Sequence, residues 1–230
     1  MKKIIYFLIA IAFIFMTTKS YAAGNSNFSG LYVGGNIGLV DTNMGGANAA
    51  MVSETPYSSS GLSSAKTAFA FGLNAGYNYK LNRIPIILGA GIIYLNNSKI
   101  TANGTLSYQG VSYPESISYS SYSYGGYLEP GVIISKRFLL YGRIGIVKNS
   151  LNNTSVQVNG STENLSFSNG GSIYYGLGAQ YLILKNVALN FEFDQVSQSI
   201  SYSGSATGTP NTTMHNYDFL VGVSYYFGNM

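Results

Sequence analysis

The 230-residue chain has no cysteine, no tryptophan and one histidine, and only 9% of its residues are charged. Soluble globular domains carry about 25% charged residues, so this composition is a poor match for a fully water-exposed surface. The absence of cysteine excludes structural disulfides and thiolate chemistry. A helical membrane protein needs apolar runs of roughly 20 residues, and the only candidate is at the N-terminus. A membrane barrel built from strands fits both facts, because only about half of each strand must be apolar.

The N-terminal segment, residues 1–23, has the parts of a secretory signal peptide. Lys2 and Lys3 form a positive start, residues 4–16 are apolar, and a small-residue cleavage pattern follows. The alternative is an N-terminal membrane anchor, for which the apolar run is short. We expect one mature domain, residues 24–230.

The charge balance of the mature domain is almost neutral. Removing the three lysines of the leader leaves nine Lys and Arg against eight Asp and Glu. With no basic patch, nucleic acid is not an expected partner. No cofactor or metal is expected either, because one histidine without clustered carboxylates does not make a metal site.

The last segment, residues 216–227, alternates between two kinds of side chain. One set is apolar or aromatic: Tyr217, Phe219, Val221, Val223, Tyr225 and Phe227. The other is mostly small or polar: Asn216, Asp218, Leu220, Gly222, Ser224 and Tyr226. Period two predicts a β-strand, and aromatics towards both ends are typical of a strand that crosses a bilayer.

The same pattern recurs along the chain and predicts eight strands. They cover residues 28–40, 67–80, 84–97, 118–134, 138–148, 170–184, 187–200 and 216–227. The inward face of 84–97 is unclear from the pattern, and Pro130 predicts a bulge or a pairing gap. Polar segments 41–66, 98–117, 149–169 and 201–213 are predicted long loops, and they alternate with short turns. Long loops alternating with short turns are typical of an antiparallel transmembrane β-barrel, whereas a soluble barrel would carry its charges outside.

Two motifs resemble those of the eight-stranded outer-membrane barrels of the outer-membrane-protein-A and opacity-type surface-antigen superfamily. The first is Gly30-Leu31-Tyr32-Val33-Gly34-Gly35-Asn36-Ile37-Gly38, and the second is the ending Gly222 followed by Tyr225-Tyr226-Phe227. The resemblance implies an all-β, eight-stranded antiparallel up-and-down barrel in the outer membrane of a Gram-negative bacterium. It also implies that Gly222, Tyr225 and Phe227 form the insertion signal, although three residues follow Phe227 here. The implied partners are outer-membrane lipid, the barrel-insertion machinery and periplasmic chaperones.

Four charged residues project into the barrel on this strand register: Glu129, Arg143, Glu192 and Asp194. A buried charge without a partner is costly, so we expect Arg143 to pair with Glu129 or Glu192. Such a network resembles the interior salt-bridge plug of the outer-membrane-protein-A barrel. The alternative is that these side chains contact only lumen water. Eight strands leave an interior just filled by side chains, so a wide pore is not expected.

His215 is the one candidate for catalysis, with Ser199 and Ser201 on the preceding strand. No motif supports a Ser–His hydrolase, and an orienting acid is missing, so the sequence favours a non-enzymatic protein.

The predicted loops are the other candidate site. The segment 113–124 is rich in Tyr and Ser, which recur in recognition surfaces; alternatively it only extends the strands and the outer aromatic girdle. We therefore expect a monomeric barrel with a structural or surface-interaction role, antigen-like or adhesin-like, that contacts a host or surface ligand through four loops. A narrow ion-conducting channel and a lipid-modifying enzyme are the alternatives.

Overall fold

The computed structural model describes residues 27–43, 57–60, 66–108, 111–164, 170–201 and 211–227. The expected leader, residues 1–23, lies outside the described residues. The described part consists of strands joined by short turns: β1 Gly30–Asn43, β2 Tyr57–Ser60, β3 Lys66–Lys80, β4 Ile86–Tyr108, β5 Val111–Ser135, β6 Phe138–Val158, β7 Ser161–Asn164, β8 Gly171–Leu182, β9 Val187–Ser201 and β10 Asn211–Tyr226. No helix among these residues is long and apolar enough to cross a membrane.

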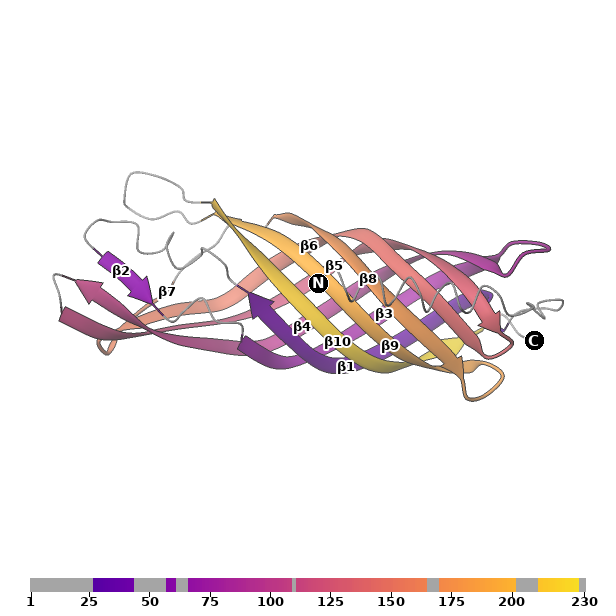
Figure 1. Cartoon of the computed structure of the whole chain (residues 1–230), viewed down its shortest axis with the longest axis horizontal. Helices are drawn as coiled ribbons and strands as arrows, with labels where there is room; N and C mark the ends of the chain where they lie inside the picture. The colour runs from indigo at the N-terminus through magenta and orange to yellow at the C-terminus, as the bar shows by residue number, and fades with distance from the viewer. Residues whose placement is uncertain are drawn as a thin grey trace, which may run out of the picture.

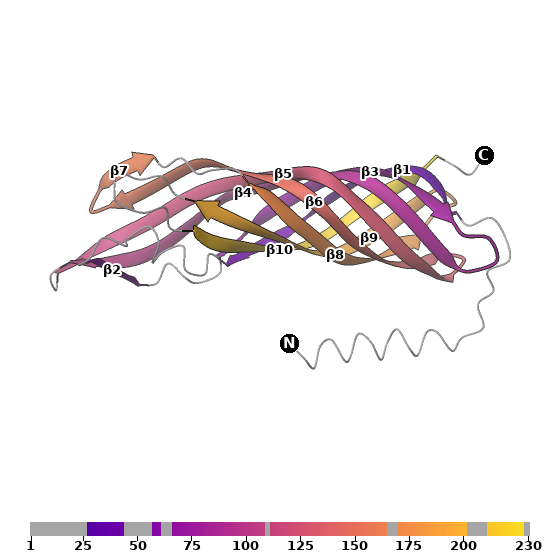
Figure 2. The same cartoon turned by 90° about the horizontal axis from the view of Figure 1, so that it is seen from above.

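Eight of the strands close into an antiparallel barrel, as the sequence predicted. The hydrogen-bonded ring runs β1-β3-β4-β5-β6-β8-β9-β10 and returns to β1 through the pairing of β1 with β10. Figure 1 and Figure 2 show the same tilted-strand cylinder from two directions at right angles. Three connections at one end are short: residues 81–85, 136–137 and 183–186. The last of these has four residues rather than the predicted two, because β8 ends at Leu182.

At the other end, the prediction of long polar loops is wrong for two segments. β4 and β5 continue as a paired hairpin through 98–117, and β6 and β7 form a second hairpin within 149–169. β2 adds to β4 inside the predicted loop 41–66. Within the fourth predicted loop, residues 202–210 lie outside the described residues. The hairpins project well beyond the cylinder in Figure 1.

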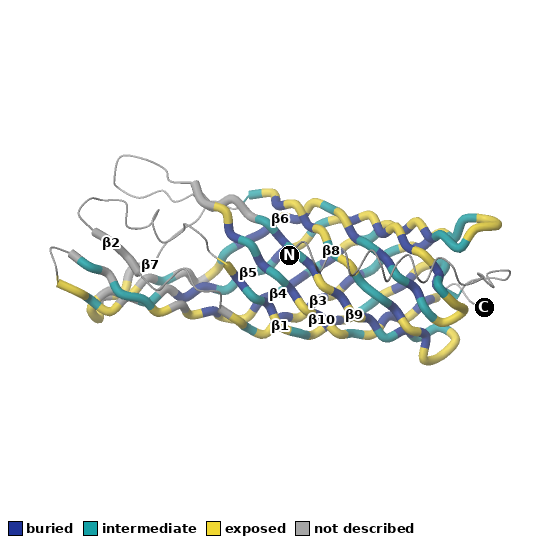
Figure 3. Tube along the Cα trace, in the orientation of Figure 1, coloured by how far each residue is buried: buried dark blue, intermediate teal, exposed yellow. Residues whose placement is uncertain are grey.

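The two faces of the wall follow the predicted alternation. Along each barrel strand, buried and exposed residues alternate, as Figure 3 shows. The ambiguous strand β4 is now assigned, because Ile87, Ile93 and Leu95 are buried inside while Leu88 and Ile92 face outwards. Pro130 produces the predicted pairing gap: neither it nor Glu129 pairs with β6, although the register on both sides of them is unchanged.

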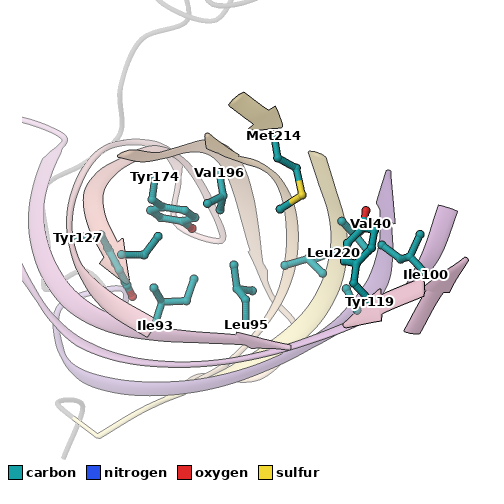
Figure 4. Packing of buried hydrophobic residues seen from close by; sticks show 12 residues of the cluster. Val40, Ile93, Leu95, Ile100, Tyr119, Tyr127, Tyr174, Val196, Met214 and Leu220 are labelled. Atoms are coloured by element: carbon teal, nitrogen blue, oxygen red, sulfur yellow. The ribbon is translucent and has the colours of Figure 1, made fainter. Parts of the chain in front are cut away.

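Three layers fill the lumen. An apolar cluster lies toward the short-turn end and contains Phe28, Tyr32, Ile87, Ile133, Leu139, Tyr141, Leu182, Ala188 and Tyr226. A second apolar cluster lies toward the hairpin end and contains Val40, Ala70, Ile93, Leu95, Ile100, Tyr119, Tyr127, Val147, Tyr174, Val196, Met214 and Leu220; Figure 4 shows it from close by. Glu129, Arg143, Glu192 and Asp194 lie between the two clusters along their strands, so each apolar layer limits the access of water to them. Asp218 lies between Met214 and Leu220 of the second cluster.

Candidate functional site

Arg143 on β6 is the centre of the charged layer and is only 3% exposed. Its Nε donates a hydrogen bond of 2.7 Å to Glu129 Oε2 on β5, and its Nη1 lies 2.8 Å from Glu192 Oε2 on β9. The guanidinium carbon lies 4.6 Å from the ring centroid of Tyr127 and 5.0 Å from that of Tyr141. One cation therefore joins two carboxylates from different strands and contacts two aromatic faces, which are favourable surroundings for a guanidinium.

Neutral side chains complete the coordination of both glutamates. Four of them donate hydrogen bonds: Tyr32 and Asn78 to Glu129 at 3.2 and 3.3 Å, and Tyr141 and Asn36 to Glu192 at 2.6 and 3.1 Å. Tyr32 and Asn36 lie on β1 and Asn78 lies on β3. The network therefore connects these two strands across the lumen to β5, β6 and β9. Charge-assisted hydrogen bonds of this kind are the strong ones in a dry interior.

Inward-facing glycines make room for the large side chains of the network. A Cβ at Gly91 would lie 2.6 Å from the Tyr127 hydroxyl oxygen, and one at Gly178 would overlap the Tyr141 ring. Tyr127 and Tyr141 thus pack against glycines of other strands, where a larger residue would displace them.

Asp194, the fourth predicted charge, lies apart from this pairing. It is 1% exposed on β9, and no ion pair within 4 Å joins it to a cation in the described part of the chain. Asp218 on β10, which the sequence reasoning did not include, pairs directly opposite Asp194 and is fully buried. The alternation of residues 216–227 could have identified Asp218, because it belongs to the inward-facing set of the last strand.

Of the expected insertion signal, Gly222 and Tyr225 lie on β10 and Phe227 follows it directly. Gly222 faces inwards, where a Cβ would collide with the Asn36 side chain. Tyr225 and Phe227 face outwards with their ring centroids 4.9 Å apart, and the Phe227 N–H donates to the Leu31 carbonyl at 2.8 Å. The end of β10 and Phe227 are therefore hydrogen-bonded into the wall beside β1.

His215 lies on the outer face of β10 rather than in the lumen. Its Nδ1 is 2.9 Å from Ser197 Oγ and 3.4 Å from Gln195 Nε2. The predicted neighbours Ser199 and Ser201 lie on β9, but their side chains are outside the described set. No carboxylate hydrogen-bonds to His215 among the described side chains, so the arrangement lacks the third member of a triad.

The hairpin end carries a row of outward-facing tyrosines. Tyr94, Tyr122 and Tyr124 on β4 and β5 stack in sequence, with centroid separations of 6.3 and 6.4 Å. The strands that carry them have 23 residues in β4 and 25 in β5. A strand needs about 9–11 residues to span a bilayer, so both continue roughly a dozen residues beyond it.

The outer surface of the cylinder is apolar in the way that lipid requires. Ile92, Ile146 and Leu128 are 67%, 73% and 60% exposed, and aromatic rings lie towards both ends of the band. A soluble protein rarely exposes an apolar surface of this extent. Together with the closed hydrogen-bond ring and the charged interior, this defines a transmembrane β-barrel.

A family model described as "outer membrane protein beta-barrel domain" matches residues 8–227, and the chain belongs to that family. It is therefore an outer-membrane barrel protein. No curated protein matches the sequence.

Solved structures with a similar fold include other outer-membrane proteins. Neisserial surface protein A is 16% identical, with 86% of this chain and 98% of that chain covered and a TM-score of 0.49. OprG from Pseudomonas aeruginosa is 13% identical, with 87% and 98% covered and a TM-score of 0.51. The attachment invasion locus protein Ail of Yersinia pestis is 14% identical, with 86% and 99% covered and a TM-score of 0.39. At these identities, the likeness to OprG supports the fold and no specific activity.

Proposed function

We propose that this protein is a surface-interaction protein in which a sealed barrel anchors a protruding sheet for recognition. The observation that carries the proposal is the five-stranded extension β2-β4-β5-β6-β7, which continues beyond the lipid-facing band. About a dozen residues of extra strand correspond to about 40 Å along each of β4 and β5. A membrane anchor alone does not need such an extension, whereas recognition sites are commonly placed on segments held out by a rigid scaffold.

The chemistry of the β4–β5 hairpin favours a neutral partner surface. Between residues 98 and 120, Lys99 and Glu115 are the only charged residues, and Ser and Tyr are the commonest. Tyrosine gives contact area with few rotatable bonds, and serine adapts its hydrogen bonds. We expect binding to a host or bacterial surface that changes little with salt, because few charges are available to be screened.

The test is a variant in which an Asn-Gly turn replaces residues 98–120. Asn97 and Ser121 are paired opposite each other, so a two-residue turn can close the shortened hairpin. Cells that display the variant are expected to lose adhesion to host-cell monolayers, while the protein still changes its gel mobility on boiling. A second variant that shortens the β6–β7 hairpin instead tests whether that part of the extension also contributes to adhesion. Full adhesion by a properly folded 98–120 variant would contradict the proposal.

The lumen supports an anchor rather than an open channel. Arg143, Glu129 and Glu192 join three strands across the interior, and apolar layers flank them. In planar bilayers we expect no steady conductance from the wild type. Stable open steps from the wild type would favour the narrow-channel alternative.

We propose a non-enzymatic role for His215 as well. It contacts Ser197 and Gln195 on the outer face without a carboxylate among the described side chains. His215→Ala is expected to leave the lipid A acylation pattern of expressing cells unchanged, as measured by mass spectrometry. A shifted acyl pattern would favour the lipid-modifying alternative.

Gly222, Tyr225 and Phe227 are proposed to direct assembly by the insertion machinery. Both rings are outward-facing at the end of β10, where a receptor can bind them before the strand pairs with β1. Replacing Tyr225 and Phe227 with Ala is expected to lower the fraction of chain that becomes heat-modifiable in cells. The control replaces the outward Val221 and Val223 with Ala, and an equal loss in both variants would contradict a specific signal.

A further inference from the structure

The buried charges of the lumen do not balance. Five charged side chains are buried among the described residues: the carboxylates Glu129, Glu192, Asp194 and Asp218, and the guanidinium of Arg143. Arg143 pairs with the two glutamates, which neutral donors also surround. Neither aspartate forms an ion pair within 4 Å with a cation in the described part of the barrel.

Both aspartates lie at the same point of the wall. They are directly opposite each other in the β9–β10 pairing, which places their Cβ atoms about 4.5–5.5 Å apart on the lumen face. Asp194 Oδ2 and both carboxylate oxygens of Asp218 have no hydrogen-bond partner among the described residues. Two like charges in this position repel each other, and each is costly to bury unpaired.

Apolar and small residues surround the pair, and the Arg143 guanidinium makes no ion pair with either aspartate within 4 Å. Val40 pairs with Asp218 from β1, and Val196 and Leu220 lie at the next inward positions of β9 and β10. On the β8 side, a Cβ at Gly176 would collide with the Asp194 carboxylate, so only glycine at this position accommodates that carboxylate.

A further unpartnered oxygen lies beside the pair. Tyr174 on β8 is fully buried and points into the lumen next to Val196 in Figure 4. By geometry its hydroxyl has no hydrogen-bond partner among the described residues, and two charged groups lie near it, the Asp194 carboxylate and the Arg143 guanidinium. It adds a neutral oxygen to three unpartnered carboxylate oxygens.

We propose that Asp194 and Asp218 bind one hard divalent cation of the calcium or magnesium class, with the Tyr174 hydroxyl as a further ligand. Carboxylate and neutral oxygens are the ligands such ions take, and water can complete the shell. The described residues contain no cluster of three or more Asp, Glu, His or Cys, so the site rests on two carboxylates and differs from a dedicated metal cage. The ion neutralises the repulsion between β9 and β10 and thereby stabilises the barrel. This proposal is independent of the hairpin function.

The test uses the full mature chain refolded in detergent with calcium, with magnesium, or with EDTA, and then desalted. Wild type is expected to retain one equivalent of calcium or magnesium by elemental analysis and to unfold at higher urea than after EDTA treatment. Asp218→Asn should retain no metal and lose the urea shift. Asp41→Asn is the matched control, because Asp41 is on β1 beside the site but faces outwards, and it should behave as wild type.

If Asp218→Asn fails to fold, the doubly neutral Asp194→Asn, Asp218→Asn variant replaces it. This variant should show a metal-independent midpoint above that of EDTA-treated wild type, because it removes the repulsion. Three results overturn the proposal: wild type that retains no metal and shows no metal-dependent shift, equal metal retention by the doubly neutral variant, or stabilisation by acid alone. The last result would assign the pair to a shared proton.

Discussion

Replacing Arg143 with methionine removes one positive charge from the lumen and keeps most of the side-chain volume. Glu129 and Glu192 then stay buried with only their neutral hydrogen bonds from Tyr32, Asn78, Tyr141 and Asn36. Breaking a buried ion pair by removing one partner costs about 3–5 kcal/mol. Arg143 pairs with two carboxylates at 2.7 and 2.8 Å, and the methionine variant also loses two cation–π contacts. We therefore expect the loss of unfolding free energy to lie in the upper part of that range.

The measurement is reversible urea unfolding in lipid vesicles, followed by tyrosine fluorescence and far-ultraviolet circular dichroism, because the chain has no tryptophan. Glu129→Gln alone should cost less than Arg143→Met, since Arg143 keeps its contact with Glu192. The triple variant Glu129→Gln, Arg143→Met, Glu192→Gln should recover most of the stability, because no uncompensated charge remains.

A loss below about 1 kcal/mol for Arg143→Met would refute the reasoning, since that is the size expected of a solvent-screened surface pair. It would mean that lumen water reaches the glutamates and that the network does not seal the barrel. Bilayer conductance gives an independent readout: the variant should show more frequent openings than wild type if the network is the seal.

The remaining predictions concern the two faces of the wall. Gly178→Ala should lower the free energy of unfolding in urea by about 1–3 kcal/mol, because the new methyl group displaces the Tyr141 ring. Gly142→Ala on the outer face should be almost neutral, because the nearest atoms to its new methyl group would lie 3.7 Å away. Ile92→Arg, in the lipid-facing band, should cost about 2–4 kcal/mol, whereas Ile183→Arg in a short turn should cost about 0–1 kcal/mol. Equal losses within either pair would contradict the assigned faces.

The direction of each side chain was predictable because the membrane gives the two faces opposite chemistry. In β10 the outward set from Tyr217 to Phe227 is uniformly apolar, and its partner set faces the lumen in the structure. The strand β4 was ambiguous for a physical reason. Its inward residues Ile93 and Leu95 belong to the apolar cluster of the lumen, so both of its faces are apolar and the alternation disappears.

The sequence did not predict the hairpins, because apolar–polar alternation marks strands with one face in lipid and does not mark strand pairing itself. Beyond the bilayer the residues of β4, β5 and β6 are mostly polar, so 98–117 and 149–169 show no continuous apolar face in the sequence, although the described strands within them stay paired. The remaining signal was the β-propensity of Tyr, Thr, Ile and Val in these segments, which is weak and depends on context. A polar segment between two membrane strands can therefore be a hairpin as readily as an irregular loop.

The level of a charged side chain along the barrel axis depends on how the strands pair. Counting residues from uncertain strand ends does not predict that level. Parity placed Asp194 and Asp218 inside, but only the β9–β10 register shows that they face each other. A shift of that register by two residues would keep both side chains inward and would place Asp218 opposite Glu192 or Val196 instead. Which charges lie beside each other at one level of the lumen thus depends on the β9–β10 register, which the sequence alone does not determine. For that reason the Arg143 network could be anticipated from a single cation, while the unbalanced aspartate pair required the structure.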